Sequence, residues 1–123
     1  MAYLIEKKLV VLDLEVYPNY VLFAFRREHD GVTLKIELRG EDSVLTDKQR
    51  TQLRNMMLGY VTFGYNSNKY DMPLIVYAMS GATANEIYEF GDEIITKGLQ
   101  PWEACNRRGI SIPATYRHFD IME

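Results

Sequence analysis

The sequence predicts an α/β domain in which helices flank a mixed sheet of about five strands. Strand-type segments joined by short turns fill the first third of the chain. Capping sequences then mark the starts of helices in the middle of the chain. A strand-type segment at 60–65 follows the first of these helices, which favours parallel pairing with the first strand. Three antiparallel strands followed by parallel ones are therefore expected.

The first three strands are predicted at residues 8–16, 20–27 and 32–38. Apolar and β-branched residues dominate the first two, and the third alternates apolar with polar positions. The Asp30-Gly31 pair between the second and third strands is typical of a tight hairpin turn. These segments should form an antiparallel meander at one edge of the sheet.

The first helix should begin after Thr46, whose hydroxyl can cap it while Gln49 returns the hydrogen bond, and it should end at Gly59. After the strand at 60–65 and a polar loop, a helix is predicted at 72–79, with proline in its first turn.

A second capping box predicts a helical stretch from Thr83 to about Lys97, which Gly91 can divide. Residues 98–113 contain scattered Gly, Pro and Asn and predict irregular structure or short helical turns. A last strand is expected at 116–122.

Composition limits the classes of protein that the chain can belong to. Its 123 residues are 47% hydrophobic and 25% charged, which predicts one globular domain over residues 1–123. A net charge of -3 argues against a general nucleic-acid coat protein but not against a nuclease, which needs acidic residues to hold metal ions. The lone Cys105 excludes an internal disulfide, and no apolar run is long enough for a membrane span. A cytoplasmic protein without membrane contact is expected.

Two acids interrupt the apolar first strand. Asp13 and Glu15 are two residues apart, so their side chains should point to the same face of the sheet. Asp71 follows the strand at 60–65 at the start of a helix, where parallel sheets bring ligand-binding residues together. Each acid alone can be an ordinary solvent-exposed or helix N-terminal residue. Together the three carboxylates predict a site for divalent cations.

At this point the motifs resemble a known family. Asp13-Leu14-Glu15 resembles the first motif of the DnaQ-like, ribonuclease H-fold 3′-to-5′ exonucleases, and is most similar to the proofreading domains of family B DNA polymerases. The segment from Asn66 to Tyr70-Asp71 resembles their second motif. His118-Phe119-Asp120-Ile121 is similar to a later strand that commonly carries an aspartate. The resemblance extends from Leu9 to Glu123 and implies a ribonuclease H-like sheet.

The resemblance implies phosphodiester hydrolysis with two Mg²⁺ or Mn²⁺ ions, acting on a single-stranded 3′ end, with DNA favoured over RNA. In that arrangement Asp13 would bridge the two ions, Glu15 would hold the ion that activates water, and Asp71 would hold the other. Asn66, Lys69 and Tyr70 are the candidate substrate contacts, and Asp120 is a further candidate metal ligand.

The chain departs from the family at its C-terminal end. In the family, the third motif is a Tyr or His followed by the fourth acidic ligand, and it lies on a helix after the last strand. This chain ends at Glu123, so a truncated domain lacking that helix is expected. Tyr116 and Asp120 have a similar spacing but fall on a predicted strand. A second chain could supply the missing helix. Three hypotheses therefore remain: an exonuclease, a catalytically degenerate binding or assembly module, and an endonuclease with a different final acid.

Overall fold

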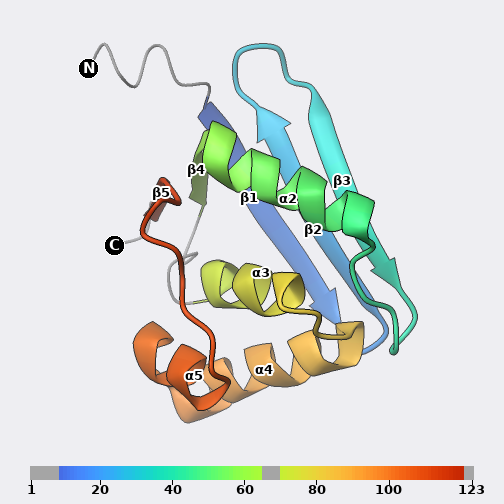
Figure 1. Ribbon diagram of the computed structural model, residues 1–123, viewed down its shortest axis with the longest axis vertical. Coiled ribbons are helices and arrows are strands. Elements are labelled where there is room, and N and C mark those ends of the chain that lie inside the picture. The colour runs from blue at the N-terminus through green and yellow to red at the C-terminus, as the bar shows by residue number, and fades with distance from the viewer. Residues whose placement is uncertain (1–8, 65–69, 121–123) are drawn as a thin grey trace.

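The computed structural model describes residues 9–64 and 70–120 (Figure 1). Its sheet has five strands in the order β3-β2-β1-β4-β5. The strands are β1 (Leu9–Tyr17), β2 (Tyr20–Arg27), β3 (Thr33–Arg39), β4 (Val61–Gly64) and β5 (His118–Asp120). β1, β2 and β3 pair antiparallel, whereas β4 lies parallel to both β1 and β5. The predicted α/β class, the antiparallel meander and the parallel strands are confirmed.

The turn between β2 and β3 has the chemistry that the sequence predicts. Gly31 adopts a φ of 72°, a left-handed conformation that suits glycine. The Asp30 carboxylate accepts a hydrogen bond from the Val32 amide at 3.0 Å and pairs with the Arg27 guanidinium at 2.8 Å. β3 begins one residue later than expected, because Val32 belongs to the turn and is half exposed.

Four helices follow the meander within the described ranges: α2 (Asp47–Gly59), α3 (Asp71–Met79), α4 (Ala84–Lys97) and α5 (Pro101–Arg107). Both predicted capping boxes are present, at the starts of α2 and α4. α4 runs through Gly91 without a break, and the short helix α5 lies in the segment for which irregular structure or short helical turns were expected. None of the helices in these ranges is both long and apolar enough to cross a membrane.

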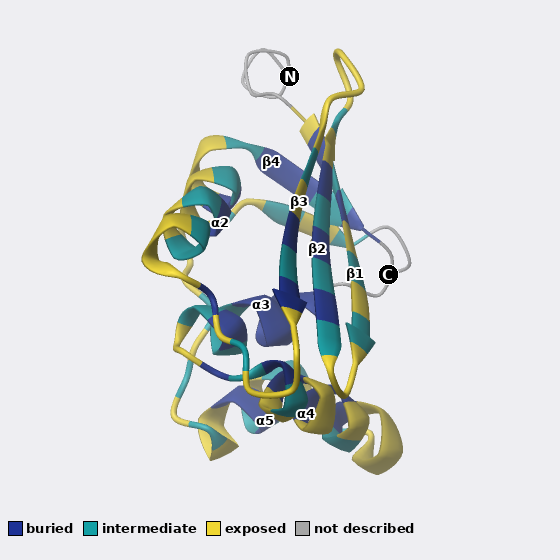
Figure 2. Ribbon diagram, turned by 90° about the vertical axis from the view of Figure 1, so that its right-hand side faces the viewer, coloured by how far each residue is buried: buried dark blue, intermediate teal, exposed yellow. Residues whose placement is uncertain are grey.

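The described helices all lie on one side of the sheet (Figures 1 and 2). Along β1, Val10 and Leu12 are buried on the covered side, where α4 packs against β1 and β2. Asp13 and Glu15 point the other way and are exposed. No helix of the described residues packs on this second side, which is called the uncovered face below. The core is thus a single layer of apolar side chains between the sheet and the helices.

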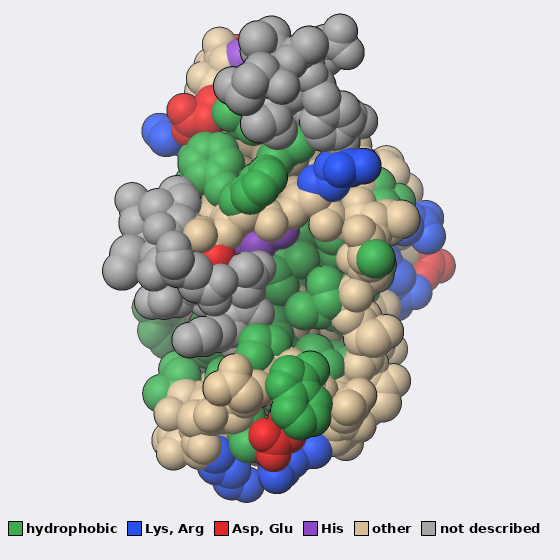
Figure 3. Space-filling model, turned by 90° about the vertical axis from the view of Figure 1, so that its left-hand side faces the viewer, with side chains coloured by type: hydrophobic (Ala, Val, Ile, Leu, Met, Phe, Trp, Pro, Cys, Tyr) green, Lys and Arg blue, Asp and Glu red, His purple; other side chains and the backbone are tan. Residues whose placement is uncertain are grey.

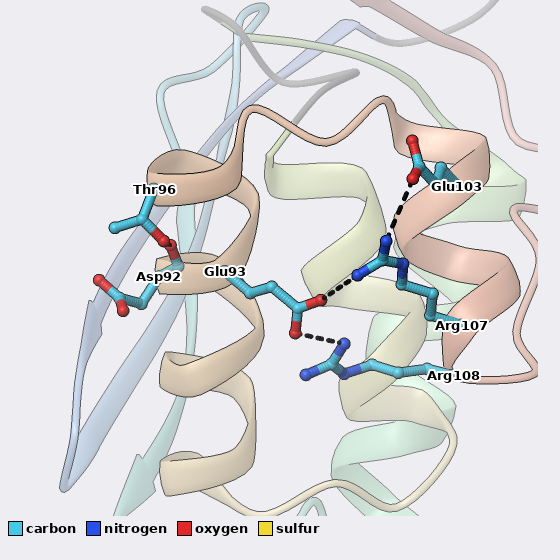
Figure 4. A network of polar contacts seen from close by, with 6 residues as sticks. All are labelled: Asp92, Glu93, Thr96, Glu103, Arg107 and Arg108. Atoms are coloured by element: carbon cyan, nitrogen blue, oxygen red, sulfur yellow. Dashed lines mark hydrogen bonds and ion pairs between the residues drawn. The ribbon is translucent and has the colours of Figure 1, made fainter.

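An ion-pair network joins α4 to α5 (Figure 4). Arg107 and Arg108 donate to the two carboxylate oxygens of Glu93 at 3.5 and 3.0 Å, and Arg107 also reaches Glu103 at 3.3 Å. The Arg108 guanidinium lies over the Phe90 ring, 4.2 Å from its centroid, so the pair is partly shielded from water. Both arginines are therefore engaged in contacts within the fold.

Replacing Thr83 by alanine should destabilise the protein by about 1 kcal/mol, because its hydroxyl accepts the Glu86 amide hydrogen bond that caps α4. The matched control is Thr96→Ala, which removes an exposed hydroxyl that donates to the Asp92 carbonyl of the same helix. Urea unfolding measures both variants. An equal loss of stability in the two would contradict a specific role for the cap.

Candidate functional site

β1 positions the first two acids on the uncovered face. The alternation of side chains along a strand turns Leu12 and Leu14 toward the helices and leaves Asp13 and Glu15 exposed on the other side. The prediction that these two carboxylates share one face is therefore confirmed. Strand pairing sets Asp13 opposite Ala24 of β2, a small side chain that leaves space beside the carboxylate.

Asp71 is the first residue of α3 and is buried, with 8% of its surface exposed. Burial, and after it the negative charges of Asp13 and Asp120, together raise the pKa of its carboxyl group from 3.8 to about 7. Both charged neighbours that contribute to this shift are carboxylates. The fold thus brings acids from β1, α3 and β5 close enough to repel one another.

β5 places Asp120 in this group. Its backbone pairs with Gly64 of β4, one residue beyond the pair formed by Phe63 and Phe119. At the start of β5, the His118 ring nitrogen Nδ1 lies 2.7 Å from the Thr62 hydroxyl oxygen, and burial lowers the pKa of this histidine. That contact connects β5 to the buried interior of β4 and so fixes the position of the strand that carries Asp120.

Glu15 lies apart from the other acids. Its charge is not among those that shift the pKa of Asp71. It contributes instead to the raised pKa of Tyr20, although the main cause of that shift is the 2.7 Å hydrogen bond from the Tyr20 hydroxyl to Glu37. The charges that act on Asp71 are thus those of Asp13 and Asp120, two of the other predicted metal ligands. In this arrangement no three His, Cys, Asp or Glu side chains within the described residues are grouped closely enough to hold a metal ion.

The predicted substrate contacts divide into two groups. Asn66 and Lys69 lie outside the described residues. Tyr70 is the N-cap residue of α3 and packs against the core with its ring beside Gly91 of α4. Burial is the main cause of its raised pKa, ahead of the charges of Asp71, Tyr88 and Asp92. Its ring is thus packed between α3 and α4 rather than extended toward solvent.

Two contacts at the site were not predicted from the sequence. One feature of the sequence could have indicated the contact between Thr62 and His118, namely a threonine in the centre of an otherwise apolar strand. The close approach of Tyr70 to Gly91 could likewise have been indicated by a glycine in the interior of a strongly amphipathic helix. Tyr116 lies before β5 and donates a hydrogen bond from its hydroxyl to the Met79 sulfur at 3.4 Å, so it packs toward α3.

The side of the molecule that carries β5 and α5 is largely apolar at its centre, with Lys and Arg side chains at its margins (Figure 3). A cavity of about 380 Å³ opens beside α5, and its lining includes Trp102, Cys105, Ile110 and Ile112. None of the candidate site residues lines it. The free Cys105 is buried at this cavity, and burial raises the pKa of its thiol, which makes it a poor nucleophile.

Comparisons of this chain with protein-family models, with curated proteins and with solved structures found no match.

Proposed function

We propose that this protein is a metal-dependent 3′-to-5′ exonuclease that hydrolyses terminal phosphodiester bonds of single-stranded nucleic acid, DNA in the first instance. The observation that carries the proposal is the position of Asp71, a buried carboxylate whose charged neighbours Asp13 and Asp120 are also acids. The ionised form of a buried carboxylate beside two other acids is unfavourable, and a bound cation would offset this cost. Sites of this kind are characteristic of function rather than of packing.

The strand order supports the proposal. A meander followed by two parallel strands, with the first strand in the centre of the sheet, is compatible with a ribonuclease H-like arrangement. The position of Asp13 on the central strand and of Asp71 after β4, at the start of α3, supports the resemblance to DnaQ-like exonucleases. Because no family model matches the chain, this resemblance rests on the motifs and on the topology alone.

The side chains fit Mg²⁺ or Mn²⁺ in their donor chemistry. Asp13, Asp71 and Asp120 offer hard carboxylate oxygens, the ligands that these ions prefer. When bound, such ions activate the attacking water and stabilise the leaving 3′ oxygen. Asp13 and Asp71 would hold them. Asp120 would join only after the side chains move closer, because no three such ligands are grouped within the described residues. Glu15 lies further along β1. Asn66 and Lys69 would contact the terminal nucleotide.

The purified protein with Mn²⁺ should therefore shorten single-stranded DNA from a 3′ end. The substrate carries a 5′ label, so that a ladder of shortened products reports the direction of digestion. A circular single strand is the control, because an exonuclease that needs a free end leaves it intact. Cutting of the circle would favour the endonuclease hypothesis, and no Mn²⁺-dependent cleavage of either substrate would contradict nuclease activity.

The alternative, a catalytically degenerate binding or assembly module, is supported by the uncovered face. Val11, Phe63 and Phe119 stand in register across three strands, and Phe119 is 55% exposed. A further chain, such as one supplying a helix, could cover these apolar side chains. This hypothesis predicts a stable complex that survives Asp13→Ala and Asp71→Ala and is lost in Phe119→Asp.

A further inference from the structure

We propose that Gly91 is a positioning residue for the candidate site: because it lacks a side chain, it gives the Tyr70 ring space against α4, and this contact holds Asp71 in place. The proposal rests on the proposed function, since Asp71 is one of its carboxylates. It also gives Tyr70 a role as a packed support, in place of the substrate contact that the motif predicts.

The distances leave no space for a larger residue. A Cβ atom built on Gly91 would lie 2.8 Å from the Tyr70 hydroxyl oxygen, and 3.0 and 3.2 Å from its ring carbons Cε2 and Cζ. Contacts under 3.0 Å are essentially never made by real Cβ atoms, so the ring would have to move. Gly91 itself is buried in the interior of α4 and does not have a positive φ.

A glycine in the middle of a helix is unfavourable, because it costs more backbone entropy than alanine. α4 needs neither a break nor a left-handed residue at this position, so backbone conformation does not explain the glycine. The close contact with Tyr70 does explain it.

Tyr70 is linked to Asp71 through the backbone. It is the N-cap residue of α3, its φ and ψ are -124° and -65°, and its carbonyl accepts the first helical hydrogen bond from Leu74 at 3.2 Å. No side chain caps this helix end. The packing of the ring on α4 therefore constrains, together with the buried residues of α3 itself, where the first turn of α3 starts and hence where the Asp71 carboxylate lies.

The test compares Gly91→Ala with Gly59→Ala, where a Cβ would meet nothing within 4 Å. Gly91→Ala should lower Mn²⁺-dependent cleavage on the order of 100-fold, the effect expected of a misplacement of about 1 Å. Gly59→Ala should leave cleavage within about twofold of the wild type. The double variant Gly91→Ala/Tyr70→Phe removes the hydroxyl that makes the closest contact and should recover most of the activity that Gly91→Ala loses.

A second readout separates this inference from the proposed function. The backbone amide NMR signals of Asp71 and Leu74 should shift in Gly91→Ala and return toward their wild-type positions in the double variant. If the wild type does not cleave, the proposed function fails, while these shifts still test the contact. Unshifted Asp71 and Leu74 signals in a folded Gly91→Ala, or unchanged cleavage by that variant, would overturn the inference.

If Gly91→Ala does not fold, the double variant Gly91→Ser/Tyr70→Leu can be measured with the same NMR signals, because leucine at position 70 has no ring to meet the side chain at position 91. Melting temperature distinguishes folding from positioning. A Gly→Ala change at an exposed position in the middle of a helix would normally raise the melting temperature, whereas the contact with Tyr70 predicts no such increase for Gly91→Ala. A gain as large as that of an unhindered site would argue against a tight contact.

Discussion

Replacing Asp71 by asparagine is expected to stabilise the protein at pH 8 while removing its metal-dependent activity. Asparagine keeps the size of the side chain but carries no charge. In the folded protein the pKa of Asp71 is raised from 3.8 to about 7, so folding favours the protonated carboxyl. The folded state therefore binds more protons than the unfolded state between these two values, and stability falls as pH rises through this window.

Above pH 7 the ionised carboxylate should cost on the order of 4 kcal/mol of stability, the free-energy equivalent of the rise in its pKa from 3.8 to about 7. The Asn variant should exceed the wild type by about that amount at pH 8, and the two should be similar near pH 4. Urea unfolding across this pH range measures the difference. Asp42→Asn, at an exposed aspartate, is the control and should follow the wild type at every pH. A variant less stable than the wild type at pH 8 would contradict the expected charge repulsion.

Replacing Asp13 by asparagine should lower the rate of Mn²⁺-dependent cleavage by roughly 100-fold or more, because even residues behind the direct ligands of a metal commonly account for tenfold to 100-fold. Glu15→Gln should cost less, since Glu15 lies outside the group of charges that acts on Asp71. The family resemblance alone predicts comparable losses for both. Single-turnover cleavage of labelled DNA compares the two variants, with equal losses favouring Glu15 as a direct ligand.

Much of the fold follows from local signals. The capping boxes at Thr46 and Thr83 gave the starts of two helices, because a side chain that bonds the helix terminus is a short-range property. Asp30-Gly31 gave the turn of the second hairpin. The helical stretch from Thr83 to Lys97 was predicted, but local sequence left open whether Gly91 divides it and whether residues 98–113 are irregular or form short helical turns, because tertiary contacts decide such cases.

The candidate site was predicted in part. Strand alternation placed Asp13 and Glu15 on one face, and the position of Asp71 after β4 indicated that it would approach β1. The sequence could not show how far along β1 that approach occurs, which depends on the register between β1 and β4. This register brings Asp13 near Asp71 and leaves Glu15 closer to Tyr20.

The same limit explains Asp120. Its membership of the site depends on the pairing of β5 with β4, a contact between segments that are far apart in the sequence. The spacing between Tyr116 and Asp120 resembles the third motif, but both were predicted on a strand, and the structure places Tyr116 before β5 and Asp120 at its end. Long-range pairing of this kind is not encoded in any short motif.

The central claim is that Asp13 and Asp71 belong to one divalent-cation site, and direct titration with Mn²⁺ tests it without any substrate. Electron paramagnetic resonance reports free Mn²⁺, so the loss of its signal at pH 8 measures bound ions in the wild type, Asp13→Asn, Asp71→Asn and Asp42→Asn. The account predicts saturable binding by the wild type and Asp42→Asn, and its loss in both site variants. Absence of saturable binding by the wild type, or equal binding by all four proteins, would contradict it.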